Sequence, residues 1–429
     1  MEYEVVLVNS GKFGKRVCKE IEKLSAGKTL LVDRAGRRSN EVAKRWIHAG
    51  ASLISRQSCY KDYGILGDVR EVEWKRVLKS VQNGLGDKFN EIFDEVALSE
   101  TREGSKREKR SEKIKSAKDP MWWKEILDRE SSRGSKWRKL VLFNEETEKQ
   151  HVHLDNLYVE MLKMEALPKR WAIEGSSYKA AEAASILSDV GCQVYLITKE
   201  KRILEEEEKN IQENITASLL EKGVVIYTES KIVANTQHGS AVEILLKERE
   251  EFEHRIKEIQ RHITEPEYGI DKRCEENVEV FRVESCERKS GVSESELVYL
   301  LTQKKIEDIR VFLAEPRFIY TNPPAASVGY TESLLSGIRG DIRTVSSKFR
   351  GLFYSVLQKK SATEYKMVVK KRTEEFVEEE RVVGVHLFGN SSFDTIKGFS
   401  IAVHVGISPE ELVRVIPIHP TSSEEVLMQ

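Results

Sequence analysis

One segment of the sequence carries a histidine and a carboxylate at a spacing that suits proton transfer. His419 is followed five residues later by Glu424, with Pro420 and a short polar run between them. A nearby acid can fix the tautomer of an imidazole and stabilise its charge once it takes up a proton. We therefore predict that His419 is a general base assisted by Glu424. The alternative is a histidine that only packs or caps the chain.

Cysteine, whose thiol such a base could deprotonate, is sparse and scattered in the sequence. None of the cysteines forms a CxxC or CxxxxC pair or a metal-ligand spacing. This pattern argues against a disulfide framework and a zinc site, and it suits a reducing compartment. We predict no metal site and a cytoplasmic location. The chain has five cysteines: Cys18, Cys59, Cys192, Cys274 and Cys286.

The bulk properties are those of a polar globular protein. The chain has 429 residues, of which 39% are hydrophobic, so it has room for two or three domains and more than one core. A net charge of -1 gives no overall attraction to nucleic acid or to a membrane surface. No apolar stretch approaches spanning length, and the first residues enter a strand-like run without a basic leader. We expect no membrane partner and no targeting segment.

Two charged segments interrupt this ordinary composition. Residues 102–118 are mostly basic and are followed by Trp122 and Trp123. They are either a nucleic-acid contact with interleaved aromatic residues or a solvated helix or loop. We favour the second interpretation and expect no nucleic-acid partner. Residues 247–262 are predicted to form an amphipathic surface helix, because three apolar residues keep helical spacing: Phe252, Ile256 and Ile259.

The elements that would position the chemistry begin with two βαβ units. Residues 3–33 indicate a strand, a glycine-containing turn, a helix and a second strand, and residues 171–198 repeat the pattern. Parallel strands need a crossover helix and place a loop at their carboxyl ends, where nucleotides bind. From Pro316 onward the pattern favours an α+β domain, with strands near 318–320, 349–357, 366–371 and 382–387 and a helix over 395–405. The predicted class is α/β, with two Rossmann-like nucleotide-binding-type domains and a C-terminal α+β domain.

The first βαβ unit has a candidate dinucleotide loop. Asn9, Gly11 and Gly14 occupy the three positions where glycines permit the turn, the approach of a pyrophosphate and helix packing. Asp33 ends the second strand, where an acid can bind a ribose hydroxyl. These residues form either a cofactor site or a Rossmann-like unit kept only for packing.

The second βαβ unit has a similar loop with Gly175, Ser177 and Ala180 at the three positions. The Ser177 side chain either obstructs the pyrophosphate or donates a hydrogen bond to it. Cations after the next strand are placed either to bind the extra phosphate of NADP or to lie in a solvated turn beside the acids 205–208. These cations are Lys199, Lys201 and Arg202.

Three segments together resemble the FAD- and NAD(P)-dependent pyridine nucleotide-disulfide oxidoreductases, and the glutathione reductases within that family. Tyr178 and Glu182 match the family's tyrosine and glutamate beside the flavin. Residues 318–332 resemble the opening of its dimerisation domain, and residues 383–406 with the His419–Glu424 tail resemble the rest of that domain.

The resemblance implies a domain plan and a reaction. Residues 1–165 and 265–315 would form an FAD-type domain, 166–264 an NAD(P)-type domain and 316–429 a C-terminal dimerisation domain. In the family, NADPH reduces FAD, FAD reduces a cysteine pair, and a histidine from the other subunit of a homodimer passes protons to glutathione disulfide. FAD and NADPH are therefore the implied cofactors, and a homodimer is the implied assembly.

Several family positions are altered in this sequence. The two redox cysteines fall on Gly36 and Glu41, whereas Lys44 falls on the flavin-side lysine and could pair with Glu182. Thiol-disulfide exchange needs a thiolate that attacks a sulfur atom, so neither replacement can support it. The family's glycine turn and its ribityl-binding aspartate correspond to 143–146 and 284–285, and we expect weakened binding of both cofactors.

The sequence therefore predicts a glutathione-reductase-like chain that is inactive as a disulfide reductase and is kept as a homodimeric scaffold or regulator. The alternative is an NAD(P)H-dependent flavin oxidoreductase that passes electrons to an acceptor other than a disulfide. In both cases the residues proposed for the cofactors are Gly11, Gly14, Asp33, Lys44, Gly175, Tyr178, Ala180, Glu182, Lys199 and Arg202.

Overall fold

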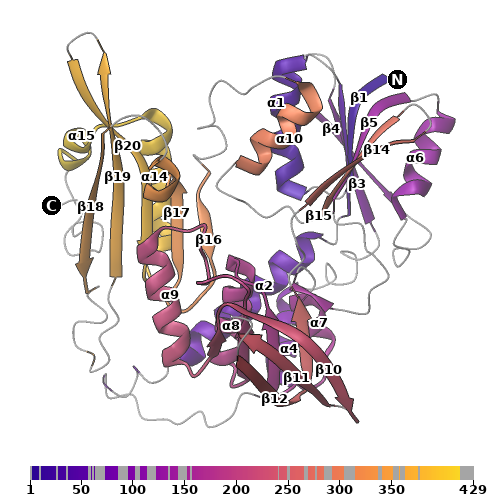
Figure 1. Cartoon of the computed structure of the whole chain (residues 1–429). Coiled ribbons are helices and arrows are strands. Elements are labelled where there is room, and N and C mark those ends of the chain that lie inside the picture. The colour runs from indigo at the N-terminus through magenta and orange to yellow at the C-terminus, as the bar shows by residue number, and fades with distance from the viewer. Residues whose placement is uncertain are drawn as a thin grey trace.

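The structure is a computed structural model of the chain. It describes residues 2–8, 11–25, 28–34, 37–56, 59, 62, 73–85, 95–101, 107–113, 122–133, 136–143, 152–154, 157–239, 241–248, 252–264, 269–275, 278–284, 292–303, 315–336, 341–350, 357, 363–374 and 377–415. Figure 1 shows the C-terminal sheet on one side, the N-terminal sheet on the other and a second α/β unit below them.

The N-terminal part is built on a seven-stranded sheet. The second half of its central strand β1, Val5 to Val8, is a continuous apolar run that is buried on both faces, as parallel strands covered by helices require. Helices α1 (Gly11–Ser25) and α10 (Val292–Thr302) cover one face, where Val17 and Leu297 join a shared core. The strands, in sheet order, are β14 (Gly269–Glu275), β15 (Val278–Glu284), β5 (Lys136–Phe143), β1 (Glu2–Val8), β2 (Thr29–Arg34), β3 (Glu95–Thr101) and β4 (Arg107–Lys113).

The second unit has an all-parallel sheet of five short strands. Its helix α8 (Tyr178–Asp189) is rich in buried alanines, which let the helix approach the sheet closely, and it ends before Gly191 at φ +91°. Helix α9 (Lys209–Glu221) follows the second strand, and α2 (Arg37–Ser55), α4 (Trp74–Leu85) and α7 (Leu157–Lys163) join the same core. The strands, in order, are β6 (Val152–His153), β13 (Arg261–Thr264), β7 (Arg170–Glu174), β8 (Gln193–Ile197) and β9 (Val225–Tyr227).

A three-stranded antiparallel sheet covers part of this unit, and it corrects one prediction. Residues 247–262 do not form an amphipathic helix but lie mainly in β12 (Phe252–Ile259), which pairs with β11 (Ala241–Glu248). The register shifts on β12 between Ile256 and Ile259, and Glu258 has φ +61°. A β-bulge of this kind places two residues that are three apart on the same face, so the spacing imitated a helix. The third strand is β10 (Ser230–His238).

The C-terminal part is a five-stranded antiparallel sheet packed against helix α14 (Ser392–Val405), which confirms the helix predicted there. Strand β18 ends at Phe349, and the strand predicted over 349–357 stays a prediction, because residues 351–356 lie outside the described residues. Short helices α12 (Glu332–Leu335) and α15 (Pro409–Val413) complete this part. The strands, in order, are β16 (Arg317–Ile319), β17 (Ala325–Gly329), β20 (Val377–Phe388), β19 (Thr363–Glu374) and β18 (Ile342–Phe349).

The basic segment 102–118 is also different from the prediction. Its central residues form β4, an edge strand antiparallel to β3, rather than a helix or a loop. Its register places Arg107 opposite Thr101 and Lys113 opposite Glu95. Trp122 begins helix α6 (Trp122–Ser132).

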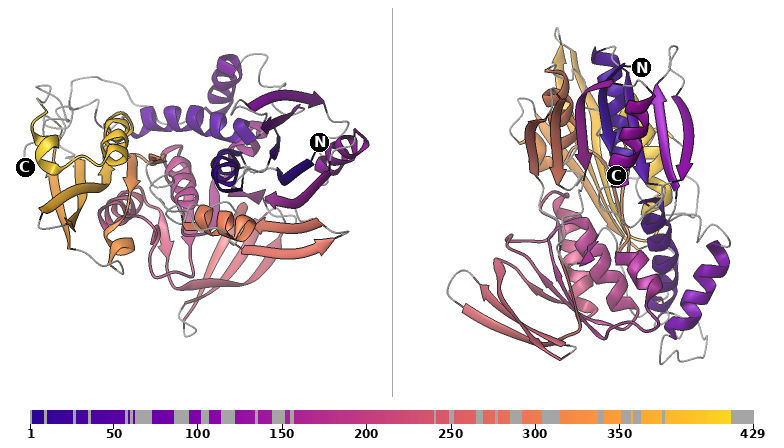
Figure 2. Two further views of the ribbon diagram at one scale, coloured as in Figure 1. Left: turned by 90° about the horizontal axis from the view of Figure 1, so that it is seen from above. Right: turned by 90° about the vertical axis from the view of Figure 1, so that its right-hand side faces the viewer.

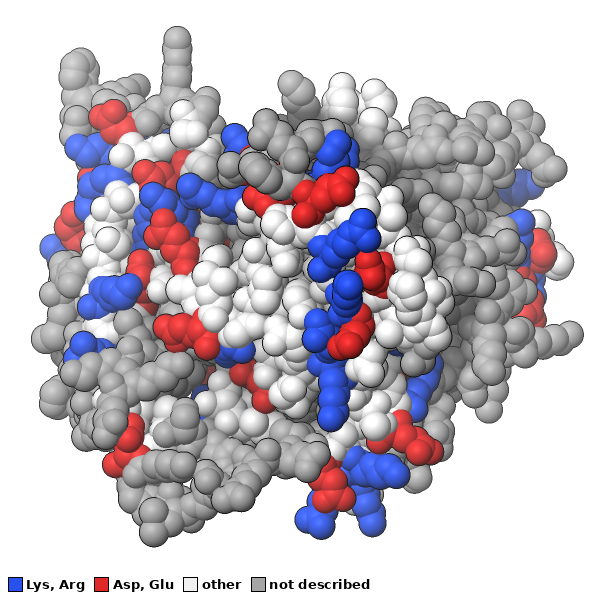
Figure 3. All heavy atoms as spheres, turned by 60° about the horizontal axis from the view of Figure 1, so that its bottom comes forward, with Lys and Arg blue, Asp and Glu red and all other residues white. Residues whose placement is uncertain are grey.

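Taken together, the two βαβ units and the C-terminal α+β part confirm the predicted α/β class. The exact domain boundaries stay a prediction. None of the described helices is both long and apolar enough to cross a membrane. On the face seen in Figure 3, acidic and basic side chains are interspersed over the described residues, in keeping with the net charge of -1.

Candidate functional site

The first candidate loop lies between β1 and α1, as predicted. Helix α1 begins at Gly11, and Gly14 is buried in its first turn against the sheet. Asp33 lies in the last part of β2, which pairs in parallel with β1. Asn9 lies outside the described residues. The first strand, the helix and the second strand are thus present, and the binding of FAD by these residues stays a prediction.

The positions assigned to the redox cysteines lie at the start of α2. Glu41 is in the first turns of this helix, and Gly36 lies outside the described residues. The structure describes the side chains of three cysteines, and Cys59 and Cys192 are free thiols. Cys18 belongs to the core under α1, Cys59 contacts Leu357, and Cys192 donates to the carbonyl of Pro168 at 3.3 Å.

Burial also works against thiolate chemistry at one of these cysteines. It raises the pKa of Cys192 to about 11, because an apolar setting disfavours the charged form. Cys192 therefore stays a thiol at neutral pH, whereas a thiolate is the nucleophile in disulfide exchange.

The predicted pair of Lys44 and Glu182 is present and buried. Lys44 Nζ lies 3.0 Å from Glu182 Oε2, and the two side chains are 6% and 1% exposed. The other carboxylate oxygen of Glu182 accepts from the backbone N–H of Tyr320 at 2.9 Å, and the Lys44 ammonium lies 4.9 Å from the centre of the Tyr320 ring. A buried carboxylate is tolerated when both of its oxygens have donors, as here.

The rest of this site was not found from the sequence. Helix α2 presents polar side chains four residues apart to the segment 320–322, and the lysine of the ion pair is the first of them. His48 Nε2 lies 3.1 Å from the carbonyl oxygen of Thr321, and Ser52 Oγ donates to Asn322 Oδ1 at 2.6 Å. Residues four apart lie on one helix face, so this spacing was the available signal.

Helix α8 contacts the same segment from the other side. Ser185 Oγ accepts from the backbone N–H of Asn322 at 3.1 Å, and Asp189 accepts from Asn322 Nδ2 at 2.6 Å. Lys222, just past α9, completes the cluster through Asp189 at 2.8 Å. The segment is therefore clamped between polar faces of α2 and α8, and we call this arrangement the interdomain clamp.

Burial sets the protonation of the titratable groups in the interdomain clamp. It lowers the pKa of His48, although the bond to the Thr321 carbonyl acts in the opposite direction. It raises the pKa of Asp189, against the attraction of Lys222. His48 is thus neutral at physiological pH and is suited to a fixed hydrogen bond rather than to proton transfer.

The second candidate loop leaves the carboxyl end of β7 and enters α8. The N–H of Gly175 donates to Ile197 O at 2.9 Å, so the glycine is held against β8. Ser177 is the N-cap of α8, and its hydroxyl accepts from Lys179 N at 3.1 Å. Tyr178 is half-buried at the first position of the helix, and Ala180, two residues further on, is buried, as close packing needs.

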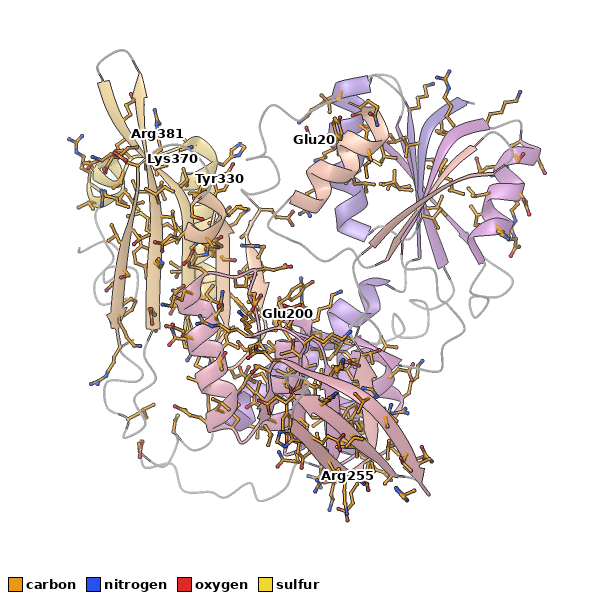
Figure 4. All side chains as sticks on the ribbon, viewed as in Figure 1. Glu20, Glu200, Arg255, Tyr330, Lys370 and Arg381 are labelled. Atoms are coloured by element: carbon orange, nitrogen blue, oxygen red, sulfur yellow. The ribbon has the colours of Figure 1, made fainter. Side chains whose placement is uncertain are left out.

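This loop fits a dinucleotide in part. The α8 N-terminus lies at the carboxyl edge of a parallel sheet, where a pyrophosphate binds. The Ser177 hydroxyl already occupies one of its backbone donors. Beyond β8, Lys199, Lys201 and Arg202 are exposed, and Glu200 lies among them in the turn (Figure 4). Both interpretations of these cations stay open.

The proton-transfer residues of the tail lie outside the described residues. The description of the chain ends at Val415, shortly after α15. The roles of His419 and Glu424 therefore stay predictions.

Comparison with known proteins agrees with this architecture. The profile of the pyridine nucleotide-disulphide oxidoreductases matches residues 133–259, and that of their dimerisation domain matches residues 315–429. The chain belongs to the pyridine nucleotide-disulfide oxidoreductase family. Residues 1–132, with the first loop and the positions of the redox cysteines, precede both matched regions.

The relatives of this family member include several glutathione reductases. The one from Yarrowia lipolytica is 23% identical over 297 residues, which are 62% of this chain and 62% of the relative. The one from a Nostoc species is 26% identical over 305 residues, 62% of this chain and 65% of the relative, and that from Schizosaccharomyces pombe is 23% identical over 296 residues, 62% of each. The chain thus spans less than two thirds of the length of these relatives.

Proposed function

We propose that this chain is a glutathione-reductase-like protein that no longer reduces disulfides and acts as a homodimeric scaffold or regulator. The observation that carries the proposal is the absence of a cysteine pair at the family positions, which are Gly36 and Glu41. Disulfide exchange requires two sulfur atoms within bonding reach. The separate surroundings of Cys59, which contacts Leu357, and of Cys192, which donates to Pro168 O, support it.

The scaffold part of the proposal rests on the contacts that are kept. The interdomain clamp joins α2 and α8 to the start of the C-terminal sheet through buried hydrogen bonds and the Lys44–Glu182 ion pair. Such contacts hold a defined arrangement of the parts whether or not electrons flow through them. The left view in Figure 2 shows α2 running between the N-terminal part and the C-terminal helices.

We infer that the partner is a second copy of this chain, bound through the C-terminal part. Residues 315–429 match a dimerisation domain, and exposed apolar side chains gather there. Apolar residues that are open in one copy are the usual centre of an interface between two. They are Ile401, Val405, Val413 and Val415, which are 58%, 70%, 54% and 53% exposed. The scattered cysteines support a location in the reducing cytoplasm.

The cofactors implied by the family are FAD and NADPH. When bound, NADPH supplies a hydride and FAD accepts it. Gly175 and the N-terminus of α8 would hold the nicotinamide dinucleotide, and Tyr178, Lys44 and Glu182 would lie beside the flavin. Because the Ser177 hydroxyl takes one donor of that helix, we propose weaker NADPH binding than in ordinary reductases.

A second function is favoured by one observation, the fully buried Lys44–Glu182 pair under Tyr320. A fixed ammonium beside a flavin stabilises the charge of its reduced form. The alternative is therefore an NAD(P)H-dependent flavin oxidoreductase that uses an acceptor other than a disulfide.

Steady-state oxidation of NADPH separates these functions. The purified chain is supplied with excess FAD and assayed with glutathione disulfide and, separately, with a quinone, beside an ordinary glutathione reductase. The scaffold proposal expects no turnover with either acceptor. Turnover with quinone alone would support the alternative, and turnover with glutathione disulfide close to that of the reference enzyme would defeat both.

A further inference from the structure

A row of polar residues crosses the C-terminal sheet at positions that stand directly opposite one another. The register pairs Arg317 with Ser327, Ser327 with His386, and His386 with Lys366, so the row spans β16, β17, β20 and β19. Directly opposite residues in antiparallel strands project from the same face of a sheet. The row therefore presents two permanent cations and an imidazole to whatever covers that face.

The start of α9 covers this row with two consecutive acids. Glu208 Oε1 lies 2.9 Å from Lys366 Nζ, and Glu207 Oε2 accepts from Ser327 Oγ at 3.2 Å and lies 3.6 Å from Arg317 Nη2. Both acids are buried, although they belong to the second unit and the row belongs to the C-terminal sheet. Figure 1 shows α9 standing beside that sheet. The contact is thus an ionic junction between two parts of the chain.

The imidazole in the middle of this junction has one unmatched nitrogen. His386 is 0% exposed, and its Nε2 lies 2.9 Å from the carbonyl oxygen of Tyr330, which follows β17 (Figure 4). A carbonyl can only accept, so Nε2 carries the hydrogen and Nδ1 of the neutral ring carries a lone pair. Among the residues that the structure describes, Nδ1 has no hydrogen-bond partner. Asn210 lies nearby and donates its Nδ2–H to His386 O at 3.4 Å, while its Oδ1 also has no described partner.

We propose that His386 is a proton-sensitive latch that holds the start of α9 on the C-terminal sheet at neutral pH and releases it in mild acid. A second proton would convert Nδ1 into a buried, charged donor without an acceptor among the described residues, which is unfavourable because a buried donor without an acceptor loses its hydrogen bonds to water. Opening the junction gives that N–H access to water. The inference does not depend on the proposed function.

The direction of the pH effect follows from the surroundings of the ring. Burial lowers the pKa of His386, against the attraction of Glu208 and the bond to Tyr330 O. The closed junction therefore resists protonation, whereas an open one protonates near the ordinary value of about 6.5. The closed state keeps its full stability above that pH and loses it as pH falls below it.

The other charged groups around the ring do not account for a loss of stability that begins just below about pH 6.5. Burial opposes ionisation of Glu208, but hydrogen bonds from Lys366 and the N–H of Glu332 outweigh it and lower its pKa, so its contribution is lost only in stronger acid. Burial likewise opposes the charge on Lys366, and its bonds to Glu208 and Glu332 raise its pKa. The remaining charges facing the junction are Glu207 from the start of α9 and Arg317 from β16.

Hydrogen exchange on the full chain tests the latch without any variant. Amide protection at the start of α9 is measured from about pH 7.5 to about pH 5.5 and corrected for intrinsic exchange, with β1 as an internal reference. We expect up to about a tenfold loss of protection at α9, since an open state with a pKa of about 6.5 gains tenfold per pH unit below it. No loss, or an equal loss in β1, would overturn the proposal.

Two matched variants identify the sensor. His386→Gln keeps an N–H at the position of Nε2 but cannot be protonated, so α9 should keep its protection at the lower pH. His254→Gln makes the same chemical change at a histidine whose side chain is 40% exposed, and it should respond like the wild type. If His386→Gln lost protection as the wild type does, another group would be the sensor and the proposal would be wrong.

Discussion

At the scale of single residues, the Lys44–Glu182 pair joins two distant parts of the sequence. Lys44 of α2 pairs with Glu182 of α8, and Glu182 also accepts from the backbone N–H of Tyr320. An ammonium and a carboxylate out of water are stable only as long as each keeps the other. The pair is therefore a sensitive indicator of the interdomain clamp.

Replacing the lysine should destabilise the fold strongly. Lys44→Met leaves the Glu182 carboxylate buried without its counter-ion, and we expect a loss of about 3–5 kcal/mol in the free energy of unfolding. Lys163→Met is the control, because its partner Glu160 lies beside it on an exposed helix face, where a pair is worth less than about 1 kcal/mol. Denaturant unfolding measures both, and equal effects would contradict the account.

The sequence predicted this pair through resemblance but not the residues around it. Lys44 and Glu182 are 138 positions apart, and only the family pattern links them. His48, Ser52 and Asp189 are polar residues on helix faces, and their partner is a turn far along the chain. Such contacts depend on how separate elements pack against each other. The periodicity of residues within one element does not specify that packing.

At the scale of elements, two glycines let neighbouring strands of the C-terminal sheet come together. Gly329 of β17 and Gly384 of β20 are register partners. A Cβ on Gly329, which has φ +82°, would lie 2.1 Å from Val383 O, and one on Gly384 would lie 2.0 Å from Tyr330 O. These obstacles are backbone atoms, so the strands themselves would have to move.

Alanine at either strand glycine should therefore be destabilising. We expect Gly384→Ala to lower the free energy of unfolding by about 1–3 kcal/mol through overpacking, with a similar loss for Gly329→Ala. Gly398→Ala is the control: nothing lies within 4 Å of its added methyl group, and alanine favours the helix by about 0.5–1 kcal/mol. Thermal unfolding should show a lower melting temperature for Gly384→Ala and Gly329→Ala and a higher one for Gly398→Ala. An unchanged melting temperature for Gly384→Ala would disprove the steric argument.

The elements themselves were predicted where local pattern and burial agree. Strands β1 and β7 are apolar runs, and α8 combines an N-cap with alanines, so their types followed from the sequence. Strand β12 was read as a helix because a bulge at Glu258 changes the spacing of its apolar residues. A bulge arises from pairing with β11, and a pattern in one strand does not reveal it.

At the scale of the whole molecule, the proposed homodimer depends on the exposed apolar face of α14. We expect light scattering to give about twice the chain mass of 49.2 kDa. Val405→Asp places a charge at the proposed interface and should yield a monomer, since burying an unpaired charge is prohibitive. Leu220→Asp on α9 introduces the same change at a side chain that is 55% exposed, and it should leave the dimer intact. A monomeric wild-type chain would contradict the homodimer. Dimers for both variants, or monomers for both, would contradict this interface.

The central claim is that no pair of cysteines cycles between dithiol and disulfide, and counting thiols tests it most directly. The chain is purified in air, denatured and labelled with a maleimide, with and without prior incubation with FAD and NADPH, and its intact mass is measured. With five cysteines and no redox pair, we predict five labels in both samples. Two fewer labels before incubation and all five after it would show a disulfide that NADPH reduces, and that result would contradict the account.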